Sequence, residues 1–535
     1  MATTQTHWLY RLPIWSLCVL MLLPAIFLVK SWWQVDTLIW QHLWDTQLLG
    51  LIKNTLILVL GVGIGVSVLG VSFAWLTAVC EFPGRKFFDW ALILPLAVPA
   101  YVLAFVTLGI FDFGGTAQSF LRSIGMQGYL EVRTPFTVVC VMTMVLYPYV
   151  YLLARAAFLA QGTELLNVAR TLGLRPFPAF FRVVLPAARS AIVAGVSLAL
   201  METLADFGAV AIFGFNTFTT AIYKSWFSLF SIETAAQLAT LLLLFVILAM
   251  TSEMYFRPRK TEQESQVKVQ DRLKLSRPVA WLATSVCTFV FLLAVALPLL
   301  QLLIWSINNL GYLFAPEFSS LVLRTFSLGA IAALIVLILA FPFAFAVRRS
   351  KSALLPEVAG WGYAIPGSVL AVGIMSLLAS ADRFLIWQGQ LFGLSLEPIF
   401  LGSLFGMLFA YVVRFFRPGY GALASGLRRV KQSYIESAVI MGSSRRRIFF
   451  GISLPLLMPG FLTGALIVFV DVIKEMPASL LLRPFGWDTL AVKIYELTSE
   501  GEWERAGLSA LVLVLVSLIP VALLIRQSRV SSLSR

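Results

Sequence analysis

Long apolar runs separated by short polar segments make up most of this chain. Many runs reach the roughly 20 residues that an α-helix needs to cross a membrane. Because backbone groups in lipid must satisfy their own hydrogen bonds, we expect these runs to be helices. Pro95 and Pro99 in the third run and Pro366 in the ninth are expected to kink their helices. The pattern predicts spans near residues 13–30, 52–79, 89–111, 135–156, 188–212, 234–256, 279–304, 324–346, 355–379, 397–415, 457–481 and 505–526.

One basic, polar loop occurs twice between these runs. The shared positions are Asn167, Ala169, Gly173 and Pro186 in the first copy (163–186), and Glu436, Ala438, Gly442 and Pro455 in the second copy (432–455). Each position recurs 269 residues later, a period far longer than a solenoid repeat. The chain therefore reads as two duplicated halves, 1–256 and 279–535, joined by a polar linker at 257–278. An even number of spans separates the copies, which predicts an all-α membrane protein of about twelve helices in two parallel six-helix repeats.

Composition and charge agree with this fold class. Of the 535 residues, 59% are hydrophobic and 12% are charged, whereas soluble domains have about 25% charged residues. With the N-terminus inside, most Lys and Arg fall in cytoplasmic segments, including both loops and the linker. The net charge of +14 therefore reflects membrane topology, and we expect no nucleic-acid partner. Trp32 and Trp33 after the first run are typical interfacial anchors, so this run reads as a helix rather than a signal peptide.

The sequence offers no catalytic constellation. The four Cys residues have no CxxC spacing, and His7 and His42 are isolated, so no metal site is predicted with certainty. The chain lacks a GxxxxGK[ST] nucleotide loop, an HExxH motif and a GxSxG motif. We therefore expect no catalytic residue and no cofactor in this chain. A membrane enzyme is the less favoured alternative.

Two acidic pairs recur at the same register in the two halves. Glu202 and Asp206 in the first half correspond to Asp471 and Glu475 in the second. Four residues apart, each pair shares one helix face if the helix continues that far. Charges at a membrane span are costly and usually face a cavity or a partner, and carboxylates suit a hard cation such as ferric iron. They therefore line a translocation path, or else they cap helices, pair with nearby lysines (Lys224, Lys474, Lys493) or contact an external protein.

Local signals in the repeated loop predict a helix–Gly–helix elbow on the cytoplasmic face. Gly173 and Gly442 can take the left-handed conformation that ends a helix. In the second copy Ser433 and Glu436 fit a capping box, and Ser443 or Ser444 can cap the next short helix. Glu436 then either caps only, or caps and also contacts a soluble partner. The arginines at 445–447 likewise contact either a partner or the lipid surface.

The repeated loop resembles the EAA loop of binding-protein-dependent ABC importer permeases. The flanking segments 202–208 and 471–478 resemble the ferric-iron type, in which two permease units are fused, and the resemblance covers essentially the whole chain. It implies a type I importer permease in a bacterial inner membrane, with both termini in the cytoplasm. It also implies two ATPase subunits that hold ATP and Mg²⁺, a solute-binding protein outside, and coupling through the eight shared loop positions.

The resemblance leaves alternatives open. Related permeases carry thiamine, polyamines, sulfate or phosphonates, so the cargo is ferric iron or another small solute. The first loop has Asn167 where the family usually has Glu, which raises the question of whether the two ATPases are engaged equally. A secondary transporter with two six-helix halves is a rival reading, against which the long basic elbows argue.

Overall fold

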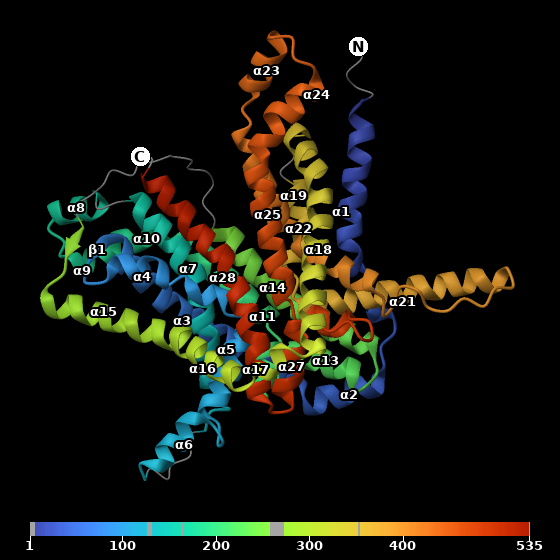
Figure 1. Ribbon diagram of the computed structural model, residues 1–535, viewed down its shortest axis with the longest axis horizontal. Coiled ribbons are helices and arrows are strands. Elements are labelled where there is room, and N and C mark those ends of the chain that lie inside the picture. Colours follow the sequence, from blue (N-terminus) through green and yellow to red (C-terminus); the bar gives the residue numbers. More distant parts are fainter. Residues whose placement is uncertain (1–5, 126–130, 162–163, 257–271, 351–353, 534–535) are drawn as a thin grey trace. The chain divides into compact units, whose positions relative to one another are not determined.

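The computed structural model describes residues 6–125, 131–161, 164–256, 272–350 and 354–533 (Figure 1). Within these ranges the elements are helices, apart from one parallel bridge between Cys80–Glu81 (β1) and Leu273–Lys274 (β2). Ten of the described helices are long and apolar enough to cross a membrane, or eleven if one bent pair counts as a single span. The predicted all-α membrane fold is confirmed.

Each repeat is built around the same three-helix core, and corresponding helices keep the 269-residue register to within a few residues. In the first repeat α3 (Leu48–Val79), α7 (Pro135–Gln161) and α11 (Arg189–Ala205) pack together. In the second repeat the core is α18 (Pro316–Ser350), α22 (Leu404–Arg429) and α25 (Leu454–Lys474). Small residues permit the close packing: a Cβ on Gly70 of α3 would lie 2.6 Å from the Cβ of Val150 on α7.

The chain folds into two compact units, each of which takes segments from both halves. Unit 1 comprises Met1–Trp40, Ile222–Thr240 and Gly311–Lys493, and unit 2 comprises Gln41–Ala221, Leu241–Leu310 and Ile494–Arg535. In unit 1, α1 (Thr6–Lys30) packs on α21 (Gly367–Leu391), where a Cβ on Gly373 would lie 2.7 Å from the Pro24 carbonyl oxygen. The predicted linker falls mostly on 257–271, outside the described residues, so the division at 257–278 stays a prediction.

Unit 2 takes its exchanged helices from the second half. These are α15 (Arg277–Phe291), the π-helical segment η4 (Leu292–Ala296), α16 (Leu297–Asn308) and α28 (Trp503–Leu533). Helix α16 packs on α28, and a Cβ on Gly507 would lie 2.7 Å from the Cβ of Trp305. The first helix of each half therefore packs on helices of the other half, α1 on α21 and α15 on α4 (Arg85–Ala91), an arrangement that the hydropathy pattern does not reveal.

Two predicted spans are broken rather than kinked. The third run divides into α4 (Arg85–Ala91), η2 (Leu94–Ala97) and α5 (Ala100–Phe111), and the ninth into α19 (Leu354–Ala359), α20 (Trp361–Ala364) and α21. The backbone is extended at Val98 and at Ile365, each of which directly precedes a proline. The proline ring disfavours a helical conformation for the residue before it, so the helix ends there instead of bending.

The tenth predicted span is also displaced. It was expected near 397–415, but α22 begins at Leu404 and extends to Arg429. Other described elements are short connections and the sixth helix of the first half: η1 (Ser31–Trp33), α2 (Thr37–Thr46), α6 (Thr116–Ser123), α13 (Phe218–Phe227), α14 (Ile232–Phe256), α17 (Leu310–Leu313) and α27 (Leu490–Ser499).

Candidate functional site

Two backbone hydrogen bonds fix the C-terminus of the helix in the second elbow. Helix α23 (Gln432–Ile440) ends before Gly442, whose φ of 76° lies in the left-handed region. The Ser443 amide donates to the Ala438 carbonyl at 3.0 Å, and the Gly442 amide donates to the Val439 carbonyl at 2.9 Å. This pair of bonds is the Schellman motif, which glycine completes without the steric cost of a Cβ. The next helix, α24 (Arg445–Ile448), then starts in a new direction.

The first elbow repeats this geometry. Helix α8 (Glu164–Thr171) is followed by Gly173 with φ 85°, and the Leu174 amide donates to the Ala169 carbonyl at 3.0 Å. The next helix, α9 (Pro176–Ala179), starts 269 residues before α24. Ala169 and Ala438 occupy the same position in the motif and are each 1% exposed. The predicted helix–Gly–helix elbow is therefore confirmed in both repeats.

Capping in the second elbow differs from the expectation. The predicted capping box between Ser433 and Glu436 is wrong. The N-cap residue of α23, which has extended backbone, is Lys431, and the helix starts at Gln432 without a side-chain cap. Ser444 does cap α24: its hydroxyl accepts the Arg447 amide at 3.4 Å. Glu436 is thus left on an exposed face of α23 without the capping role.

The elbows lead into the third core helix differently in the two repeats. Both continue through a π-helical segment, η3 (Phe180–Val184) or η5 (Phe449–Ser453), and Pro186 and Pro455 lie exposed in the first turn that follows. In the first repeat, α10 (Leu185–Ala187) meets α11 with a bend of 67° between the flanking segments. In the second repeat, residues 446–474 run as one span. The second elbow therefore continues into its core helix without a comparable bend.

Both elbows expose apolar side chains next to polar ones. Val439, Ile440 and Met441 are 58%, 85% and 76% exposed, and Val168 and Leu172 of the first elbow are 56% and 77% exposed. Asn167 and Glu436 are exposed at equivalent positions. Contiguous exposed apolar side chains rimmed by polar residues mark sites of protein–protein contact. The elbows therefore have the chemistry of a docking surface.

The acidic residues at the ends of α11 and α25 cap the helices that follow. Helix α11 ends at Ala205, and the Asp206 carboxylate accepts the Ala209 amide at 2.9 Å, which caps α12 (Gly208–Ile212). Glu475 follows the end of α25 and accepts the Ala478 amide at 3.2 Å, which caps α26 (Pro477–Leu482). A carboxylate satisfies free amides at a helix N-terminus and is favoured by the helix dipole.

One expectation about these pairs is corrected. The helices end before Asp206 and Glu475, so neither pair shares the face of one continuous helix. Glu202 and Asp471 remain within α11 and α25 and are half-buried. Capping is confirmed for Asp206 and Glu475, while pairing with Lys224, Lys474 or Lys493 and the lining of a path stay predictions.

Sequence reasoning missed Arg414, a buried partner of Glu475. The Arg414 Nε lies 3.0 Å from Glu475 Oε2, and the residues are 9% and 7% exposed. The first repeat has Val145 at the position equivalent to Arg414. The available signal was an arginine inside an apolar run, because such a charge normally has a partner in the protein.

In the part of the chain that the structure describes, no group of three or more His, Cys, Asp or Glu side chains is placed to hold a metal ion. Four cysteines are free thiols: Cys18, Cys80, Cys140 and Cys287.

Comparison with known proteins gives the family. The family described as "Binding-protein-dependent transport system inner membrane component" matches the chain twice, at residues 67–262 and 358–532. The Fe(3+)-transport system permease protein FbpB 2 of Haemophilus influenzae is 27% identical over 96% of this chain and 98% of its own length. The sulfate transport system permease protein CysT of Escherichia coli is 28% identical over 36% of this chain and 69% of its own. The molybdenum transport system permease protein ModB of Escherichia coli is 31% identical over 28% of this chain and 63% of its own length.

Proposed function

The chain belongs to the family of binding-protein-dependent transport system inner membrane components, and from this premise we propose that it forms the translocation path for ferric iron. It is a multi-pass inner-membrane permease subunit rather than an enzyme. In our proposal a solute-binding protein delivers the cargo from outside. Two ATPase subunits bind ATP and Mg²⁺ in the cytoplasm, where both termini of this chain also lie. The chain itself carries no cofactor.

The observation that carries the coupling role is the pair of matching elbows. Each has a left-handed glycine, a buried alanine and exposed apolar side chains, in the same register 269 residues apart. Two similar elbow surfaces would suit two similar ATPase subunits. We assign coupling to Asn167, Ala169, Gly173, Pro186, Glu436, Ala438, Gly442 and Pro455. Closure of the ATPase pair would move the elbows and, through η3 and η5, the third core helix of each repeat.

Ferric iron is favoured because a relative that matches 96% of this chain over 98% of its own length is a Fe(3+)-transport system permease protein. In this proposal the translocation path passes Glu202, Asp206, Asp471 and Glu475. The matches to sulfate and molybdenum permeases support an oxyanion as the second candidate cargo, although each covers 36% of the chain or less.

Reconstituted transport tests the proposal. The chain is placed in liposomes with its ATPase and binding protein, and uptake of radioactive ferric iron is compared with that of sulfate and molybdate. We expect ATP-dependent uptake of iron only. Uptake of an oxyanion would replace the cargo assignment and leave the coupling intact. Uptake that proceeds without an ATPase would overturn the coupling role and favour a secondary transporter.

A further inference from the structure

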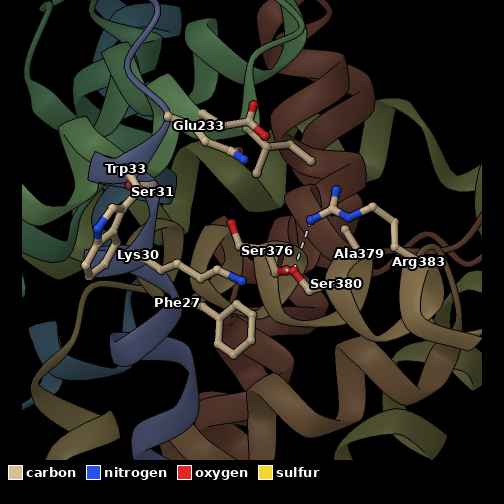
Figure 2. A pocket seen from close by; sticks show the side chains of 11 residues that line it. Phe27, Lys30, Ser31, Trp33, Glu233, Ser376, Ala379, Ser380 and Arg383 are labelled. Carbon is tan, nitrogen blue, oxygen red and sulfur yellow. Dashed lines mark hydrogen bonds between the residues drawn. The ribbon is translucent and has the colours of Figure 1, made fainter.

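A cavity of about 100 Å³ lies in unit 1 where the end of α1, the start of α14 and the middle of α21 meet (Figure 2). The volume exceeds the roughly 30 Å³ that one water molecule occupies in the liquid, so the cavity has room for a multi-atom group. Three ionisable side chains line it: Lys30 from α1, Glu233 from α14 and Arg383 from α21. It is separate from the elbows and from the acidic helix caps.

The wall between α1 and α14 is fixed by three hydrogen bonds, of which the one from Gln237 to Ser31 is buried. The Gln237 side-chain amide, fully buried on α14, donates to the Ser31 carbonyl at 2.8 Å and to the Gln34 carbonyl at 3.2 Å. The Trp32 indole donates to the Thr240 hydroxyl at 2.8 Å. Satisfied polar networks of this kind rigidify their surroundings. The segment after α1 is therefore held in place as one side of the cavity.

The opposite wall is a ladder of polar side chains on α21. Ser376, Ser380 and Arg383 lie on successive turns of one helix face, and Arg383 Nη2 donates to the Ser380 hydroxyl at 3.0 Å. In Figure 2 the Lys30 ammonium and the Arg383 guanidinium approach this serine pair from two sides. The Ser380 hydroxyl itself donates to the Ser376 carbonyl at 2.8 Å, so the positive charge of this wall comes from Lys30 and Arg383. Two neighbouring cations suit an anion with several oxygens, above all a phosphate.

Glu233 gives the cavity a negative pole as well. Figure 2 shows its carboxylate across the cavity from Lys30, and in the part of the chain that the structure describes it forms no ion pair with Lys30 or Arg383. A simple anion would occupy the positive pole and leave Glu233 without a partner. A ligand that carries both a phosphate and a hydrogen-bonding ammonium group matches both poles.

Apolar surface suited to lipid tails adjoins the cavity. Val29, next to Lys30, is 55% exposed, and Phe384, next to Arg383, is 58% exposed. Trp33, which also lines the cavity, is 78% exposed at the end of the membrane helix α1. Tryptophan concentrates at the level of lipid headgroups, so the cavity lies where a headgroup and its tails would both find partners.

We propose that this cavity binds the headgroup of a phospholipid with a primary ammonium group, of the phosphoethanolamine type. The phosphate contacts Lys30 and Arg383, and the ammonium contacts Glu233. The lipid then braces α1 against α21 and α14 within unit 1. The proposal does not depend on the cargo or on the ATPase coupling.

Native mass spectrometry of the purified full chain tests this proposal. The chain is released from nanodiscs that contain equal amounts of phosphatidylethanolamine, phosphatidylcholine and phosphatidylglycerol, and the retained lipid is counted. We expect phosphatidylethanolamine to be retained about tenfold over phosphatidylcholine, whose quaternary ammonium cannot donate a hydrogen bond. Equal retention of all three lipids would overturn the proposal.

Variants separate the two poles of the cavity. Glu233→Gln should abolish the preference for phosphatidylethanolamine, and Arg383→Ala should reduce retention of every lipid, while the conservative Arg383→Lys should restore it. Arg122→Ala is the matched control: Arg122 also lies three residues after a serine to which it donates, Ser119, but it does not line this cavity. An unchanged lipid preference in Glu233→Gln would refute the role of that carboxylate.

Two other occupants would give different results. If free phosphoethanolamine displaces the lipid at equal concentration, the site recognises a soluble headgroup compound, and the lipid assignment is wrong. If the cavity instead receives an acidic loop of the binding protein, no lipid is selectively retained, and Arg383→Ala weakens docking of the binding protein. Either result would overturn the proposal.

Discussion

Arg414 and Glu475 form a buried ion pair that connects α22 to the break between α25 and α26. Their charged atoms are 3.0 Å apart, and Arg414 also donates to the Ile365 carbonyl at 2.7 Å. The pair therefore links the two chain breaks of the second repeat, the one before Pro366 and the one at Glu475. The first repeat has Val145 and Asp206 at the equivalent positions and lacks this link. The duplication has thus kept the fold while changing the charge balance at the breaks.

Arg414→Met should lower the stability of the folded chain by about 3–5 kcal/mol, because it leaves the Glu475 carboxylate buried without its counter-charge. Thermal or denaturant unfolding of the purified protein measures this loss. Arg417→Met on the same helix is the control. Arg417 pairs with Glu357 at 3.1 Å, but both side chains are substantially exposed, so the expected loss is under about 1 kcal/mol. Similar losses in the two variants would contradict the assignment.

Gly442→Val should stop ATP-driven uptake while the chain still inserts and folds. A β-branched residue at a φ of 76° is strained by about 1–2 kcal/mol or more, so the elbow would reach its ATPase at a changed angle. Uptake at matched membrane levels is the measurement. Gly451→Val is the control, since a Cβ at Gly451 meets no atom within 4 Å and its φ is not positive. Full uptake by Gly442→Val would remove this glycine from the coupling mechanism.

Much of the fold follows from local signals in the sequence. Apolar run lengths predict most of the spans, and glycines at a fixed register predict both elbows, because the left-handed conformation at Gly173 and Gly442 is a local backbone property. The breaks before Pro99 and Pro366 were predicted only as kinks, although the restriction that proline places on the preceding residue is also local. The packing of α1 and α15 on helices of the opposite half could not be predicted from the sequence, because hydropathy does not specify which helices pack together.

The candidate site was predictable to the extent that its chemistry is local. Asp206 and Glu475 were identified from their register, but their capping role depends on where α11 and α25 end, and helix ends are poorly specified by apolar patterns. Arg414 lies more than fifty residues from Glu475 in the sequence, so only tertiary packing brings the two together. The cavity beside Lys30, Glu233 and Arg383 combines three distant segments and leaves no contiguous motif.

Glu436→Ala should reduce uptake more than Asn167→Ala, by about tenfold against about threefold, since a charged group gives a stronger hydrogen bond to a partner than a neutral amide. The capping box is absent, so in our proposal the effect of Glu436 comes from contact with the ATPase. Uptake at matched expression and pull-down of the ATPase measure the difference. Equal losses would mean that the two elbows act alike despite the substitution.

The charge difference at the chain breaks predicts how the acidic residues contribute to the path. Asp206→Asn keeps a side-chain oxygen that can still cap α12. It removes the negative charge of Asp206, and in the described residues no arginine pairs with this charge as Arg414 pairs with Glu475. It should therefore slow uptake of ferric iron by about tenfold, equivalent to roughly 1.4 kcal/mol in rate, without loss of folding. Glu475→Gln should instead lower stability, because it leaves Arg414 buried without its counter-charge.

Glu357→Gln controls for the removal of one negative charge elsewhere, because Glu357 pairs with Arg417 and both side chains are substantially exposed. It should leave the uptake rate nearly unchanged. Docking of the binding protein has to be measured on the same Asp206→Asn preparation, since lost docking would also stop uptake. If Asp206→Asn docks normally, hydrolyses ATP normally and still imports iron at the unmodified rate, then Asp206 serves only to cap α12, and the path lies elsewhere.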